Sequence, residues 1–279
     1  MPLDTGFPTS DAQNDFSRAR RHQAVARLAQ RLRREPSDVN MILPFDEVVE
    51  ALGRTGERSL GLQSILLDSI VGSVGRTREF DRSFHPTSQR VRDRWERIAV
   101  AQRKGESMPP IQVYRIGDLH FVKDGHHRVS VARAQGRQDI DAQVTEVKTA
   151  IEPEQALGIG DLPLKSHQRV FFERVPLPPE ARGRIHLSDP WDYGKLAEAV
   201  EAWGFRTIQA RGELLGREEV AELWFREDYE PIVAALSEAE MLGEEETETE
   251  AYLRIVGERY LLTRSHQWDE SVLERLKRR

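Results

Sequence analysis

Residues 123–132, with the sequence KDGHHRVSVA, constrain the fold more than any other part of the chain. They follow a short apolar run at residues 119–122 and lead into a helical pattern that stops at Gly136. This order predicts a strand, a glycine turn and a helix. The N-terminus of a helix presents free N–H groups and a partial positive charge, and glycine lets a ligand approach the backbone. The sequence therefore predicts an anion site at this turn.

The composition sets limits on the class of protein. The chain has 279 residues and a net charge of −6, so it is long enough for one large domain or two and carries no general attraction for nucleic acid. It has no cysteine, which excludes disulfides, thiolate metal ligands and cysteine nucleophiles. Neither a membrane-spanning run nor a signal-peptide pattern is present, so we expect a cytoplasmic protein with no membrane partner.

Local patterns around the turn predict a compact mixed domain. Polar and glycine-bearing residues at 54–63 indicate a loop, and the apolar run at 64–71 indicates a buried strand. Gly117 and Asp118 suit a tight hairpin turn between two strands. The predicted elements are a helix over 44–52, the strand over 64–71, a charged glycine loop over 72–82, a helix over 89–104, strands over 111–116 and 119–122, and a strand over 140–147.

The N-terminal region reads as a loose segment over residues 1–13 followed by a helix over 14–34. Phe16, Val25, Leu28 and Leu32 are its expected buried stripe, and seven arginines accompany them. Two interpretations remain open. The helix is either a solvated element packed through a narrow stripe or a basic arm for nucleic acid or nucleotide phosphate.

Beyond residue 150 the pattern becomes mainly helical. A proline- and glycine-bearing connector covers 151–165, and a Thr247–Glu250 pair resembles a capping box. Short strands are expected at 169–175 and 184–187, and helices at 192–203 (closed by Gly204), 217–225, 229–236, after 247, and 269–277. We therefore expect an α+β fold in three parts: an N-terminal helical segment (1–60), a mixed domain (61–150) and a mainly α-helical C-terminal module (151–279).

The segments PPIQVY (109–114), FVKDGHHRVSVARA (121–134) and IDAQV (140–144) together resemble the ParB N-terminal domain of the ParB/sulfiredoxin superfamily. The resemblance spans residues 65–150 and implies a domain in which a glycine-led turn and an arginine hold nucleotide phosphates. It places Gly125, His126, His127 and Arg128 at those phosphates. Residues 70–82 are similar to the first conserved box of the superfamily, which makes Arg76 the supporting arginine.

A second resemblance covers the tail. The segments ELWFREDYEPIV (222–233) and TETEAYLRIV (247–256) look like an uncharacterised bacterial family that joins a ParB-like domain to a helical C-terminal module. This similarity implies no activity.

The chain also departs from its relatives in ways that narrow the chemistry. ParB partition proteins carry Gly-Glu-Arg-Arg or Gly-His-Arg-Arg at the turn and read operators through a helix-turn-helix, which is not evident here after residue 150. Sulfiredoxins need a cysteine at the turn, so sulfinic acid repair is excluded. Free serine kinases of the superfamily carry Asp-Gly-His-Thr-Arg, which is similar to residues 124–128. Their catalytic glutamate precedes the turn, and Glu79 is the matching candidate.

The two histidines do not predict a metal site. Neighbouring residues on a helix point about 100° apart, which makes a shared ion awkward. We expect His126 to cap the helix, touch phosphate or act as a general base, and His127 to pack beside the ligand. In the purely structural interpretation, Asp124 caps the helix and Arg128 pairs with a carboxylate.

Three functional hypotheses follow. The first is a protein that binds a nucleotide (ATP, ADP or CTP) with Mg²⁺ and hydrolyses it or transfers a phosphoryl group to a small-molecule acceptor, with Asp124, Glu79, Asp81 and His126 as candidate catalytic residues. The second is a non-enzymatic, DNA-associated switch that forms a homodimer through its C-terminal helices. The third is a ParB-like nuclease whose metal ligands would come from Asp68, Glu79, Asp81 and Asp124.

Overall fold

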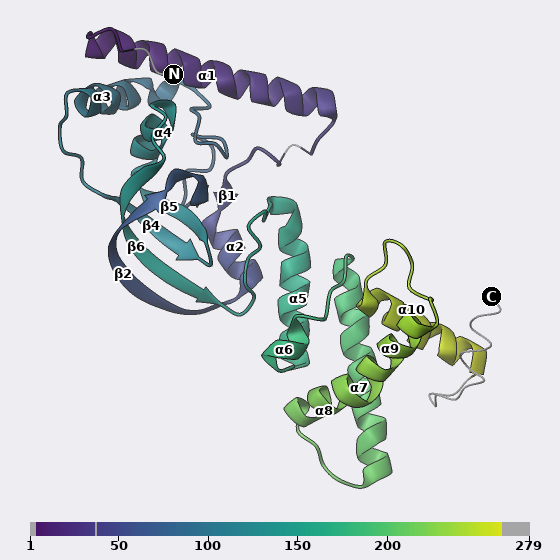
Figure 1. The fold of residues 1–279 in the computed structure, drawn as a ribbon. Coiled ribbons are helices and arrows are strands. Elements are labelled where there is room, and N and C mark those ends of the chain that lie inside the picture. Colours follow the sequence, from purple (N-terminus) through teal and green to yellow (C-terminus); the bar gives the residue numbers. More distant parts are fainter. Residues whose placement is uncertain (1–3, 37, 264–279) are drawn as a thin grey trace. The chain divides into compact units, whose positions relative to one another are not determined.

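The chain folds into two compact units, whose boundary in the sequence falls between Leu162 and Pro163. The computed structural model describes residues 4–36 and 38–263. The first unit combines helices with a six-stranded mixed sheet, and the described part of the second consists of helices and the loops that join them (Figure 1). The expected mixture of α and β structure is confirmed at this level. No helix among the described residues is long and apolar enough to cross a membrane.

The sheet of the first unit has the strand order β1-β3-β5-β4-β6-β2. Neighbouring strands run parallel in the pairs β1–β3, β3–β5 and β4–β6, and antiparallel in β4–β5 and β2–β6. The predicted hairpin is confirmed, because Ile116 pairs with Leu119 across the turn. The strands are β1 (Leu43–Pro44), β2 (Arg54–Leu66), β3 (Ile70–Ser73), β4 (Ile111–Ile116), β5 (Leu119–Asp124) and β6 (Asp139–Thr149).

The parallel strands β1, β3 and β5 end at the same edge of the sheet. Pro44 lies beside Ser73 in the register, and Ser73 lies beside Val122, two residues before the end of β5. The helices α2 (Phe45–Leu52) and α4 (His126–Ala134) start directly after β1 and β5. In open sheets of this kind, ligands bind at the carboxyl ends of parallel strands. This edge is therefore the expected position of a ligand site.

The strand β2 corrects the sequence prediction. Residues 54–63 form a strand rather than a loop, and the apolar run at 64–71 is interrupted by a 3₁₀ turn at Leu67–Ser69. β2 is an edge strand that pairs with β6 along its length, and Ile65 is its buried residue. Backbone pairing with a distant strand stabilises it, and apolar burial contributes little, so its sequence carries no strand pattern.

The helices of the first unit form layers over the sheet. α4 packs on β4 and β5, and α3 (Arg92–Arg103) and α1 (Pro8–Arg33) pack outside α4 (Figure 1). The ring of Phe16 on α1 meets that of Trp95 on α3 edge-on, with centroids 5.5 Å apart. On the opposite face of the sheet, Phe45 stacks on Tyr114 at 4.5 Å. The predicted helices over 44–52 and 89–104 are confirmed, the latter as a 3₁₀ turn leading into α3.

The helix α1 differs from the prediction in two respects. It begins at Pro8, so residues 8–13 are helical, whereas residues 1–3 of the expected loose segment lie outside the described residues. Pro8 suits a first helical turn, and Thr5 donates its amide and hydroxyl hydrogens to Asp11 there. The expected apolar stripe is wrong beyond Phe16, because Val25, Leu28 and Leu32 are exposed by 65%, 58% and 76%.

The second unit contains six helices among the described residues: α5 (Leu162–Arg174), α6 (Pro179–Arg182), α7 (Pro190–Arg211), α8 (Arg217–Trp224), α9 (Glu230–Glu238) and α10 (Glu248–Thr263). The predicted helices over 217–225 and 229–236 are confirmed, and a π-helical turn at Phe225–Tyr229 joins α8 to α9. The capping box is confirmed, because Thr247 and Glu250 exchange hydrogen bonds through amide and side chain.

The structure corrects two predictions for this unit and does not describe the residues of a third. The expected strands at 169–175 and 184–187 are wrong, because the first lies largely in α5 and the second is irregular. α7 does not end at Gly204 but continues to Arg211. The glycine is needed there for packing, because a Cβ would lie 2.4 Å from Cγ1 of Val220. The predicted helix over 269–277 lies outside the described residues.

Candidate functional site

The turn between β5 and α4 has the predicted strand, glycine and helix. Gly125 adopts a left-handed conformation with a φ of +103°, which side chains rarely tolerate. A Cβ at this position would also lie 2.4 Å from Cγ2 of Ile111 on β4. Both the backbone angle and the packing against β4 therefore require glycine here.

The first turn of α4 is open. No side chain caps it among the described residues, so Asp124 does not take the capping role of the structural interpretation. The amide of Val129 is the first to bond within the helix, to the carbonyl of Gly125. The N–H groups ahead of it carry the positive end of the helix dipole. An anion at the end of β5 would meet these groups.

Arg128 is already held by oxygen atoms around it. Its guanidinium donates to the carboxylate of Asp124 at 2.5 Å and to the carbonyl of Pro110 at 3.0 Å, and it also bonds the carbonyl of Pro109. These contacts tie the first turn of α4 to the segment that enters β4. The arginine–carboxylate pairing of the structural interpretation is present, and it leaves Asp124 59% exposed at its side chain.

Ser73 is a site residue that the sequence did not single out. Its Oγ lies 2.7 Å from Nε2 of His126, and both residues are buried. The amide of Arg76 donates to the same Oγ at 3.3 Å, so the hydroxyl hydrogen is free to point at the histidine. The parallel register of β3 and β5 puts Ser73 next to the turn. No local sequence pattern encodes that pairing.

His127 points into an aromatic environment. Its ring meets Phe80 edge-on with centroids 5.3 Å apart, while the ring of His126 stacks on Phe80 and Phe84 at 6.4 Å each. Nδ1 of His127 is buried and has no hydrogen-bond partner among the described residues. An unpaired buried nitrogen is costly, which is typical of a residue kept for more than packing.

Both histidines are neutral near pH 7. Burial lowers the pKa of His126 to about 4, and the positive charge of Arg76 adds to this effect. Burial also lowers the pKa of His127 to about 4, with Arg94 as the next contributor. A general base works best with a pKa near the operating pH, so neither histidine is well suited to that role. His126 serves instead as a neutral hydrogen-bonding partner of Ser73.

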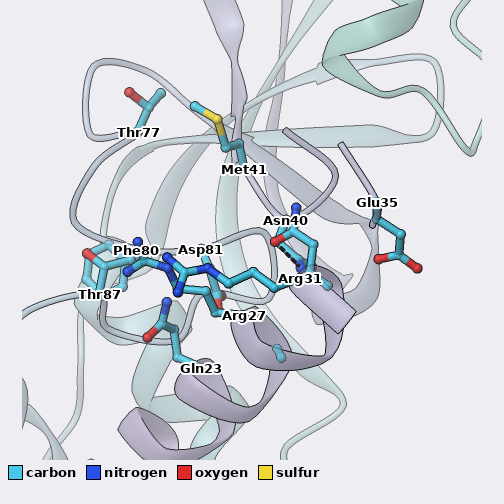
Figure 2. A pocket seen from close by; sticks show the side chains of 12 residues that line it. Gln23, Arg27, Arg31, Glu35, Asn40, Met41, Thr77, Phe80, Asp81 and Thr87 are labelled. Atoms are coloured by element: carbon cyan, nitrogen blue, oxygen red, sulfur yellow. Dashed lines mark hydrogen bonds between the residues drawn. The ribbon is translucent and has the colours of Figure 1, made fainter. Parts of the chain in front are cut away.

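The loop after β3 approaches the turn through Arg76 and Glu79. These two side chains form an ion pair at 2.9 Å, and their charges act on the pKa values of both histidines. Asp81 is oriented differently, because it accepts hydrogen bonds from the amide and Nδ1 of His85 at 2.8 and 3.3 Å. The structure therefore brings Arg76 and Glu79 toward the turn and directs Asp81 to a separate cavity (Figure 2).

The carboxylates do not form a metal centre of their own. Within residues 4–36 and 38–263, no group of three or more histidine, aspartate or glutamate side chains is arranged to hold an ion. Glu79 and Asp124 each pair with an arginine. A divalent cation could use one of these carboxylates together with ligand oxygens, in the way that Mg²⁺ is held on nucleotide phosphates.

Cavities lie on two sides of the turn. Arg128 lines one of about 390 Å³, together with Pro109 and Pro110. Phe80 and Asp81 line another of about 400 Å³, together with residues of α1 (Figure 2). No model of a known protein family matches the chain, and a search of curated proteins finds no match. The assignment of function therefore depends on the residues and their geometry.

Proposed function

We propose that the first unit is a ParB-like nucleotide-binding domain that holds the phosphates of a nucleoside di- or triphosphate at residues 124–128. The observation that carries this proposal is the uncapped first turn of α4 at the edge where β1, β3 and β5 end. The resemblance of residues 109–144 to the ParB N-terminal domain points to the same turn. Backbone amides and a helix dipole at such an edge suit phosphate oxygens.

The side chains around the turn have different roles in this proposal. Ser73 holds the ring of His126 by a hydrogen bond, which fixes the start of α4. Arg76 reaches the phosphates from the loop after β3, since its side chain is 44% exposed and its one ion pair among the described residues is with Glu79. Arg128 braces the turn through Pro109 and Pro110, and it can exchange Asp124 for a phosphate oxygen.

Chemistry beyond binding would use a carboxylate beside the phosphates. Glu79 is the best placed of the candidates, because its charge acts on both histidines of the turn. Mg²⁺ bound to the nucleotide would neutralise phosphate charge, and Glu79 or Asp124 would be its protein ligand. Release of Glu79 from Arg76 frees that carboxylate to orient water for hydrolysis or the hydroxyl of a small-molecule acceptor for phosphoryl transfer.

Thermal unfolding of the full chain with ATP, ADP and CTP, each with and without Mg²⁺, tests the proposal. We expect a nucleotide to raise the midpoint, and Arg76→Ala and Arg128→Ala to reduce that rise. Arg78→Ala is the matched control, since Arg78 is exposed on the same loop and has no ion-pair partner among the described residues. Phosphorus NMR of the mixture then shows whether phosphate is released or transferred. Absence of a response to all three nucleotides would refute the proposal.

A further inference from the structure

A second cavity, distinct from the phosphate turn, lies between the C-terminal half of α1 and the loop after β3 (Figure 2). Its volume of about 400 Å³ is within the range of small-molecule sites. The lining side chains come from α1, from the segment after it, and from the loop: Gln23, Ala26, Arg27, Gln30, Arg31, Glu35, Asn40, Met41, Thr77, Phe80, Asp81 and Thr87.

Two arginines of this cavity are unpaired. Arg27 and Arg31 are four residues apart, so they project from the same side of α1, and both line the cavity (Figure 2). Among the described residues, neither has an ion pair or a hydrogen bond through its side chain. Other arginines of the same helix are engaged: Arg20 bonds the carbonyl of Pro86, and Arg33 pairs with Glu35.

The carboxylates of the cavity are already used. Asp81 accepts two hydrogen bonds from His85, and Glu35 pairs with Arg33. Neither carboxylate forms an ion pair with Arg27 or Arg31 among the described residues, so both exposed guanidinium groups remain available to a ligand in this open cavity. A dianionic phosphate group would match two such charges, whereas a single carboxylate would match one, and the guanidinium fork suits phosphate oxygens.

Uncharged polar groups complete the lining. Thr87 donates its hydroxyl hydrogen to the carbonyl of Arg78 and keeps lone pairs for a ligand donor, while Gln23 and Asn40 offer amide groups. The aromatic ring of Phe80 forms an apolar wall, and the same ring contacts His126 and His127 of the turn. The cavity can therefore hold a hydroxylated body beside a phosphate.

We propose that this cavity is a second ligand site, which binds a small molecule bearing a dianionic phosphate through Arg27 and Arg31. This site does not depend on the nucleotide proposed for residues 124–128. Phe80 lies between the two sites, so a ligand in one contacts a residue that packs against the other.

Isothermal titration of the full chain with inorganic phosphate and with glycerol phosphate tests this site. Binding should be saturable, and an Arg27→Gln/Arg31→Gln double variant should weaken it at least about tenfold through the loss of two charge-assisted contacts. The control, Arg21→Gln/Arg34→Gln, removes the same charge from α1 and its C-cap at positions outside the cavity lining. It should bind as the unmodified chain does, and so should Arg128→Ala.

Three results would overturn the proposal. The first is no binding of either probe. The second is equal weakening by the two double variants, which would mean a general charge effect of α1. The third is retardation of duplex DNA at low salt that both double variants abolish and that phosphate does not compete with, since α1 would then be a basic arm for nucleic acid. Loss of the nucleotide response in Arg128→Ala with retained phosphate binding separates this site from the turn.

Discussion

The Oγ of Ser73 lies 2.7 Å from Nε2 of His126 and joins the end of β3 to the first turn of α4. The amide of Arg76 donates to the same oxygen, which adds the loop after β3 to this contact. This contact fixes the helix start on which the proposed phosphate site depends.

Ser73→Ala should destabilise the protein by about 1–3 kcal/mol, because it leaves the buried Nε2 of His126 without its hydrogen-bond partner. Urea unfolding followed by circular dichroism measures the change. Ser83→Ala is the control, since Ser83 is exposed on the following loop and should change the free energy of unfolding by less than about 0.5 kcal/mol. Equal stability of the two variants would contradict the role given to the contact.

Stability should fall as the pH is lowered from 7.5 to 5. His120, His126 and His127 are buried, and burial lowers the pKa of each from 6.5 to about 4. The unfolded chain therefore binds protons in this window that the folded chain does not. Each histidine contributes up to about 2 kcal/mol of loss between these two pH values.

Urea unfolding at both pH values measures this loss. His120→Gln removes one titrating group away from the proposed site and should make the pH dependence shallower. A free energy of unfolding that stays constant or rises on acidification would show that these histidines titrate normally.

Gly125→Ala should cost about 2–4 kcal/mol, because it adds strain at positive φ to an overlap with Ile111. Gly136→Ala provides a matched comparison. Gly136 also has a positive φ of +72°, but a Cβ there meets nothing within 4 Å, so strain alone should cost about 1–2 kcal/mol. Thermal unfolding of both variants gives the difference, and the packing argument fails if Gly136→Ala is the more damaging substitution.

Arg103→Ala should detach α1 from α3. Arg103 forms ion pairs with Asp15 and, at 3.8 Å, with Asp11, and both carboxylates are buried. Loss of the arginine leaves Asp15 with Arg18 and Asp11 with its hydrogen bonds from Thr5, so the expected cost is that of the lost charge-assisted contacts, about 1.5–3 kcal/mol. Arg97→Ala, at an exposed position of the same helix, is the control. Tryptophan fluorescence would report the change, because Trp95 packs against Phe16 of α1. An unchanged unfolding midpoint in Arg103→Ala would refute this account.

Features encoded locally were predictable from the sequence. The hairpin at Gly117 and Asp118, the glycine turn at Gly125 and the capping box at Thr247 all depend on residues close together in the chain. Features set by distant partners were not predictable. β2 exists because it pairs with β6, and α7 passes Gly204 because Val220 crosses there.

The candidate site divides in the same way. The turn at residues 124–128 is evident from the sequence pattern. Arg76 and Glu79 approach this turn because they lie on the charged glycine loop that was expected to face it. Ser73 could not be chosen without the register of β3 against β5. The sequence showed Arg27 and Arg31 only as two of the arginines of a basic helix. Which arginines are paired and which line the second cavity depends on residues distant in the chain, such as Pro86 and Asp81.

The pairing of β2 with β6 affects the order in which the first unit can fold during synthesis. During synthesis, residues 54–66 leave the ribosome well before residues 139–149, their partner in the sheet. Until then β2 is an unpaired strand with exposed hydrogen-bonding groups, and the outer half of the sheet cannot close. The turn at Gly125 emerges before β6 does, so the proposed phosphate site completes its sheet only when the last strand arrives.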